Sequence, residues 1–145
     1  MKYELDINDT IEVNGINLYR IVALKDFGDV KIGDRGGFIA NTDNLSQEDT
    51  CWVAGDAEVF GNARVFGNAE VFGDAEVFGN ALVFGDARVF GDALVFGDAW
   101  VYSNAWVAGD ARVFGNALVL GNAWVYSNAW IAGDAEVYGN AEVSK

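Results

Sequence analysis

The chain of 145 residues contains no histidine and no proline, and it has a single cysteine. The missing histidine removes the side chain that most often serves as a general base near neutral pH. One cysteine excludes an internal disulfide. The missing proline leaves every backbone N–H able to donate, as a continuously hydrogen-bonded β structure requires.

Basic residues are also scarce. Nine Lys and Arg face 22 Asp and Glu, which gives a net charge of −13. Direct binding of nucleic acid is excluded, because neutralising phosphates needs a basic surface, whereas a partner protein with a basic face is compatible. Residues 1–6 form no apolar leader and no stretch approaches the length of a membrane span, so we expect a cytoplasmic protein without membrane contact.

From residue 51 to residue 140 the chain repeats one hexapeptide without insertion or deletion. Its order is Ala, a variable residue, Val, usually an aromatic residue, Gly, and Asp or Asn, and the 90 residues hold fifteen copies. Cys51 replaces the first Ala and Ile131 replaces one Val. A short period of this regularity predicts stacked units, each of which buries its apolar edge on the next.

Within each copy, the run Ala-x-Val-aromatic has the alternation of a β-strand. Ala and Val point to one face, while the variable and aromatic residues point to the other. Gly followed by Asp or Asn then supplies a corner, since Gly accepts positive φ and Asp or Asn hydrogen-bonds nearby backbone.

This iterated pattern resembles the hexapeptide-repeat proteins of the left-handed parallel β-helix class. Val53, Val59 and Val65 take the aliphatic place of that family, and Ala57 and Ala63 take the small place. The resemblance implies an all-β, single-stranded left-handed parallel β-helix, a three-sided solenoid of about five coils over residues 51–145. The chain departs from the family in having Phe or Tyr between the aliphatic residue and Gly. Residues 18–39 are also similar to the leader that precedes such repeats in uncharacterised bacterial and phage-borne proteins.

The arginines favour an 18-residue turn over a 24-residue turn. Residues 99–122 recur almost unchanged at 123–143, which is a unit of four hexapeptides. A 24-residue turn, however, would stack Arg64, Arg88 and Arg112 at about 4.8 Å in a column of like charge. An 18-residue turn places them on three different sides.

Residues 1–50 are not repetitive, and we interpret them as a cap that closes the first coil. Asn14-Gly15 between two strand-like runs predicts a β-hairpin. Gly33, Gly36 and Gly37 predict tight turns.

No residue stands out as catalytic. Hexapeptide-repeat β-helix proteins are often acyltransferases with a histidine base, and this chain has no histidine to fill that role. Cys51 takes an inward place, so we interpret it as a small buried residue. The sequence predicts no cofactor and no metal, and a degenerate acyltransferase relative is the weakest alternative.

With three sides, one corner becomes a column of acids. Its members are Asp56, Asp74, Asp92 and Asp110. One interpretation takes Asp and Asn as interchangeable turn residues. The other is an acidic ridge that imitates a row of phosphates, by analogy of shape with acidic solenoids that mimic DNA.

The outward positions are unusually apolar from residue 82 to residue 130. We expect a binding surface that consists of Leu82, Trp100, Trp106, Leu118, Trp124 and Trp130. In the 18-residue register, Leu82, Trp100 and Leu118 line one face between Arg64 and Glu136. Such a stripe indicates an interface. The alternative is that the aromatic rings stack on one another as ladders. We expect ladders along the N-terminal coils and an interface from Leu82 to Trp130.

The sequence therefore predicts a non-catalytic β-solenoid interaction or scaffolding module that forms a homo-oligomer, a dimer or a trimer. The alternative from another class is an acidic inhibitor of a basic host protein that binds nucleic acid, such as a phage anti-defence factor. Binding of a small molecule between subunits stays open.

Overall fold

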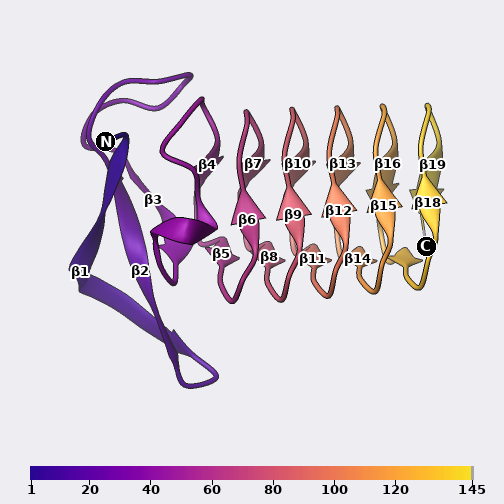
Figure 1. The fold of residues 1–145 in the computed structure, drawn as a ribbon, viewed down its shortest axis with the longest axis horizontal. Coiled ribbons are helices and arrows are strands. Elements are labelled where there is room, and N and C mark those ends of the chain that lie inside the picture. Colours follow the sequence, from indigo (N-terminus) through magenta and orange to yellow (C-terminus); the bar gives the residue numbers. More distant parts are fainter. Residues whose placement is uncertain (145) are drawn as a thin grey trace.

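The computed structural model describes residues 1–144 and is built from β-strands. Among these residues the only helical segment is the single-turn 3₁₀ helix η1 (Thr42–Asn44), and no helix there is long and apolar enough to cross a membrane. An antiparallel hairpin, β1 (Tyr3–Val13) and β2 (Ile16–Ala23), stands at one end of a column of stacked coils, and the C-terminus lies at the other end (Figure 1).

The column has three sides, which we name after one outward residue of each. The Phe60 side continues the hairpin sheet through β3 (Arg35–Ile39), β5 (Glu58–Val59), β8 (Glu76–Val77), β11 (Leu94–Val95), β14 (Arg112–Val113) and β17 (Trp130–Ile131). The Trp100 side consists of β6 (Arg64–Val65), β9 (Leu82–Val83), β12 (Trp100–Val101), β15 (Leu118–Val119) and β18 (Glu136–Val137). The Trp106 side consists of β4 (Trp52–Val53), β7 (Glu70–Val71), β10 (Arg88–Val89), β13 (Trp106–Val107), β16 (Trp124–Tyr126) and β19 (Glu142–Ser144).

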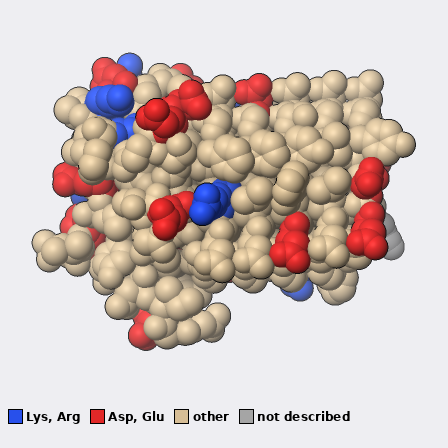
Figure 2. Space-filling view, viewed as in Figure 1, with Lys and Arg blue, Asp and Glu red and all other residues tan. Residues whose placement is uncertain are grey.

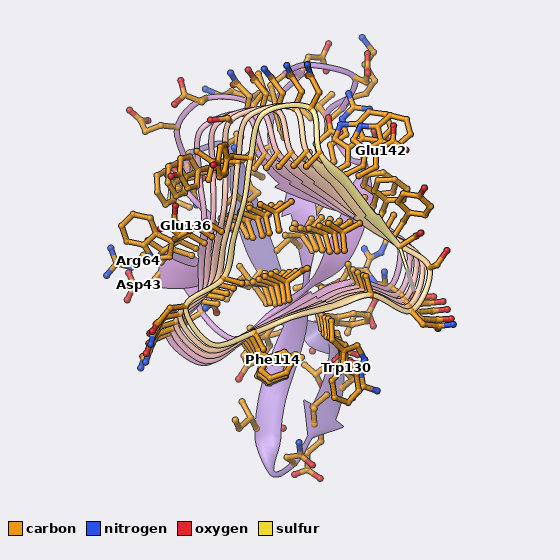
Figure 3. The ribbon with its side chains drawn as sticks, turned by 90° about the vertical axis from the view of Figure 1, so that its right-hand side faces the viewer. Asp43, Arg64, Phe114, Trp130, Glu136 and Glu142 are labelled. Atoms are coloured by element: carbon orange, nitrogen blue, oxygen red, sulfur yellow. The ribbon has the colours of Figure 1, made fainter. Side chains whose placement is uncertain are left out.

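From β4 onward, each strand of the column pairs in parallel with the strand 18 residues away, which confirms the three-sided turn. Trp100, for example, lies opposite Leu82 on one coil and opposite Leu118 on the next. Seen from the C-terminal end, the chain passes clockwise from Trp130 to Glu136 to Glu142 while it advances toward the viewer (Figure 3). A coil that turns clockwise as it approaches is left-handed, as the resemblance to the hexapeptide-repeat class implies.

The number of coils differs from the expected five. The Phe60 side and the Trp106 side each hold six parallel strands. The extra layer arises because β3 pairs in parallel with β5 and Leu45 bridges Val65, although neither segment carries the hexapeptide pattern. The non-repetitive residues 35–50 therefore supply two sides of the first coil, and β4 of the first hexapeptide completes it. Residue 145 of the predicted solenoid range lies outside the described residues.

Alanine and valine fill the interior, as the alternation predicts. From Ala57 to Val125 the inward residues are between 0% and 1% exposed. Figure 3 shows them as ladders inside the triangle, with the outward side chains beyond the ribbon. Small and β-branched side chains suit such a narrow core, because identical residues on successive coils fit together without voids.

The hairpin and the residues after it close the first coil. Asn14 at φ 50° and Gly15 at φ 83° form the two-residue turn between Val13 and Ile16. The buried Tyr3 hydroxyl donates to the Leu45 carbonyl at 2.6 Å. The hairpin therefore seals the end that would otherwise expose core residues and unpaired backbone.

Two of the three predicted glycine turns are wrong. Gly33 lies in a turn at φ 90°, but Gly36 and Gly37 lie inside β3 and are buried. A Cβ atom at Gly36 would lie 2.4 Å from the Val53 carbonyl oxygen, and one at Gly37 would lie 2.5 Å from that of Ala57. Glycine is required here by close backbone approach and not by a turn.

Candidate interaction surface

The outward residues form vertical columns, because every copy repeats its register 18 residues later. On the Trp100 side one column consists of the variable residues Arg64, Leu82, Trp100, Leu118 and Glu136. A second column beside it holds the residues that follow each Val, namely Phe66, Phe84, Tyr102, Leu120 and Tyr138. Every residue between the two charged ends is uncharged.

Aromatic rings on this side stack on one another. The ring centroids of Phe66, Phe84 and Tyr102 are 4.8 Å apart at each step, with planes within 2° of parallel. Trp100 meets both Phe84 and Tyr102 edge to face. These contacts leave the indole at the centre of the side 42% exposed. Figure 2 looks onto this side, and its middle is uncharged.

The charged ends of the column are not used within the chain. Neither Arg64 nor Glu136 forms an ion pair within residues 1–144, and both are exposed. Asp43 lines a shallow hollow together with Arg64, and Figure 3 shows the two side chains on the same edge of the column. The Trp100 side is thus an apolar strip with a cation at one end and an anion at the other.

The six residues expected to form one binding surface lie on all three sides. Leu82, Trp100 and Leu118 come together on the Trp100 side. Trp106 and Trp124 stack at 5.2 Å on the Trp106 side, and Trp130 lies on the Phe60 side with 64% of its surface exposed. The division follows from the 18-residue register, since these tryptophans occupy different phases of the turn.

The Trp106 side is hollowed where the sequence has Ala in the aromatic place. A hollow of about 310 Å³ is lined by Phe90, Trp106, Ala108, Trp124 and Tyr126. Ala54 takes the same place three coils earlier and lines a larger hollow of about 490 Å³. The sequence carries a signal for these hollows that the periodicity analysis missed: each Ala in an aromatic place follows a Trp two residues before it.

The predicted acidic column is present at the corner that follows the Trp106 side. The side chains of Asp56, Asp74, Asp92 and Asp110 are exposed, and each backbone N–H donates to the Gly or Ser carbonyl of the next coil. At the other corners, Asn side chains bridge coils, as in the bond from Asn80 Nδ2 to Asp98 Oδ1 at 3.1 Å. Within residues 1–144 no group of His, Cys, Asp and Glu has the arrangement of a metal site.

Cys51 lies fully buried beneath the cap. Burial raises the pKa of its thiol, while the nearby Lys2 ammonium acts in the opposite direction. Lys2 Nζ lies 3.3 Å from Cys51 Sγ and donates to the carbonyl oxygens of Cys51, Glu48 and Asp49. Burial in turn lowers the pKa of Lys2. Lys2 and Cys51 therefore fill the interior of the first coil beneath the cap, where the Lys2 ammonium satisfies three backbone carbonyl oxygens.

One family comparison agrees with this architecture. A family described as the YdcK β-solenoid repeat matches residues 87–103 and 111–127. The first range runs from Ala87 to Ser103 and includes Trp100, and the second runs from Ala111 to Ser127. No curated protein matches the chain. The chain is a β-solenoid repeat protein, and two of its segments are similar to the YdcK repeat.

Proposed function

We propose that this chain is a non-catalytic β-solenoid module that self-associates through the Trp100 side. One observation carries the proposal: this side presents an uncharged strip from Leu82 to Leu118, with a half-exposed Trp100 at its centre. Soluble chains rarely expose contiguous apolar surface without a partner. Tryptophan at the centre of a patch is the usual position of a binding hot spot.

A catalytic role has little support among the side chains. The chain has no histidine, and the only thiol is buried with a raised pKa, which makes it a poor nucleophile at neutral pH. An acyltransferase relative would have to use a carboxylate as its general base. Asp29, Asp34 and Glu70 line the larger hollow, and among residues 1–144 no carboxylate lines the hollow beside Trp106. We therefore propose binding as the activity.

A second candidate is an acidic surface that binds a basic protein. The column from Asp56 to Asp110 and the net charge of −13 favour it. Salt separates the two functions. Association of two chains that each carry −13 strengthens as salt screens their repulsion, whereas binding to a basic partner weakens.

Sedimentation equilibrium from about 1 to about 200 μM tests self-association, because small interfaces give weak dimers. We expect the wild-type chain to dimerise and the Trp100→Glu variant to bind at least about tenfold more weakly, as loss of a hot spot predicts. Trp124→Glu is the matched control, since Trp124 is 45% exposed and lies on the Trp106 side. Equal weakening by both changes, or a wild-type chain that is monomeric at every concentration, contradicts the proposal.

A further inference from the structure

We infer that two copies pack Trp100 side against Trp100 side with their column axes antiparallel, around a twofold axis at the level of Trp100. This arrangement rests on the self-association proposed above, and it adds the partner's orientation and register. Its basis is the order of residues along the column of variable residues.

That order is symmetric in chemistry about its centre. Leu82 and Leu118 lie one coil before and one coil after Trp100, and Arg64 and Glu136 lie two coils before and after it. At about 4.8 Å per coil, the two charges lie roughly 19 Å apart along the axis. Reversing the column therefore exchanges Leu for Leu and a cation for an anion.

A twofold axis between facing sides has two simple orientations. If the axis runs along the columns, each residue meets its own equivalent at the same level, so Arg64 is level with Arg64 and Glu136 with Glu136. If the axis crosses the columns at the level of Trp100, Arg64 of one copy faces Glu136 of the other, and Leu82 faces Leu118. Only the second orientation gives opposite charges at both ends, and like charges across an interface oppose association.

The neighbouring column fits the same orientation. A twofold axis that crosses the columns keeps each column opposite itself, so Tyr102 meets Tyr102 and Phe84 meets Leu120. No charged residue lies in this column. The apolar centre is therefore matched by apolar residues, and both Arg–Glu pairs lie at the rim, where they set orientation more than affinity.

The contact is small, which fits a reversible dimer. A strip roughly 19 Å long and about 13 Å wide covers about 250 Å² on each copy, on the order of 500 Å² in total, which is the size of a weak, transient contact. Asp43 beside Arg64 adds one carboxylate at each end that faces Glu136 of the second copy. Removing that charge with Asp43→Asn should strengthen the dimer about twofold to fivefold.

Charge reversal tests the orientation. We expect Arg64→Glu and Glu136→Arg each to raise the dimer dissociation constant about tenfold, because each change replaces two attractive pairs with two repulsive ones. The combined variant should return to within about threefold of the wild type. Arg112→Glu on the Phe60 side is the control and should have no effect. Single reversals without loss, or a combined variant without recovery, overturn the antiparallel arrangement.

Thiol cross-linking gives an independent measurement. A short bismaleimide should join the Leu82→Cys variant to the Leu118→Cys variant when the two are mixed, and neither to itself, while the buried Cys51 stays unmodified. Efficient cross-linking of Leu82→Cys to itself would indicate parallel columns and overturn this inference, yet leave self-association intact. A chain that is monomeric throughout overturns both proposals.

Discussion

The interrupted aromatic column on the Trp106 side allows one quantitative prediction. Phe72 and Phe90 stack there with centroids 4.9 Å apart, and the next place holds Ala108 before the column resumes at Tyr126. The missing ring leaves the hollow of about 310 Å³. We expect Ala108→Phe to fill it and to stabilise the fold.

The gain follows from the intact columns. On the Phe60 side the ring of Phe78 is stacked between Phe60 at 5.1 Å and Phe96 at 5.0 Å. A ring at position 108 would likewise have two neighbours, Phe90 and Tyr126. Each aromatic pair contributes about 0.5–1.5 kcal/mol. Ordering the new side chain costs about 0.5–1 kcal/mol, and Trp106, which now meets Phe90 edge to face, must turn aside. The net stabilisation should be about 1 kcal/mol.

Calorimetry and urea unfolding measure this gain. For a domain of this size, about 1 kcal/mol raises Tm by roughly 2–4 °C. Ala132→Phe is the matched control, because Ala132 lies in the last coil of the Phe60 side and would stack on Phe114 alone, so we expect about half the effect. A less stable Ala108→Phe variant, or an equal gain from Ala132→Phe, would refute stacking in the gap as the source of stability.

Three further perturbations address the cap and the corners. Lys2→Met keeps most of the volume but removes the donor to three backbone carbonyls in residues 48–51, so urea unfolding should show a loss of about 2–4 kcal/mol; a smaller loss than 1 kcal/mol contradicts this role. Asp6 accepts a hydrogen bond from Arg35 at 2.8 Å, which holds the pKa of Asp6 below the usual 3.8. The contribution of this ion pair to the stability of the hairpin is therefore present above about pH 4 and is lost as the pH falls through the lowered pKa. Amide exchange in the hairpin should accelerate over that acid range, and Arg35→Gln should remove most of the change. Gly97 has φ 67°, and a Cβ atom there would lie only 2.9 Å from the backbone of the next coil, whereas a Cβ at Gly139 would have nothing within 4 Å. Gly97→Ala should therefore lower the free energy of unfolding more than Gly139→Ala does. Equal losses of stability would show that the positive φ alone causes the cost.

The repeated part of the fold is predictable from the sequence because its inward residues do not vary. Once Val and Ala occupy every inward place, the register is fixed, and the residues 18 positions apart must share a column. The first coil was not predictable in this way. Leu45 and β3 occupy the places of a coil without the hexapeptide pattern, and Gly36 admits the Val53 carbonyl through its missing Cβ. These contacts join distant segments and leave no period to detect.

The candidate surface was partly predictable for the same reason. The stripe of Leu82, Trp100 and Leu118 follows from the register, whereas the hollow at Ala108 depends on how a neighbouring indole packs. Periodicity places a residue on a side and a level. Whether its ring lies flat, stands on edge or leaves a gap depends on contacts that the period does not contain.

The arginines on the other two sides contact residues of their own columns, which supports the proposal that a second copy binds to the Trp100 side. On the Trp106 side, Arg88 Nε lies 3.7 Å from Glu70 Oε1, and its guanidinium lies 5.5 Å from the centre of the Trp106 ring.

On the Phe60 side, the Arg112 guanidinium lies 5.4 Å from the centre of the Trp130 ring. These two arginines already have partners within their own columns. Arg64 and Glu136 have no ion-pair partner within residues 1–144, and four coils separate them. Because four coils of a rigid column separate Arg64 from Glu136, the two cannot pair with each other, and the antiparallel copy proposed above would pair both at once.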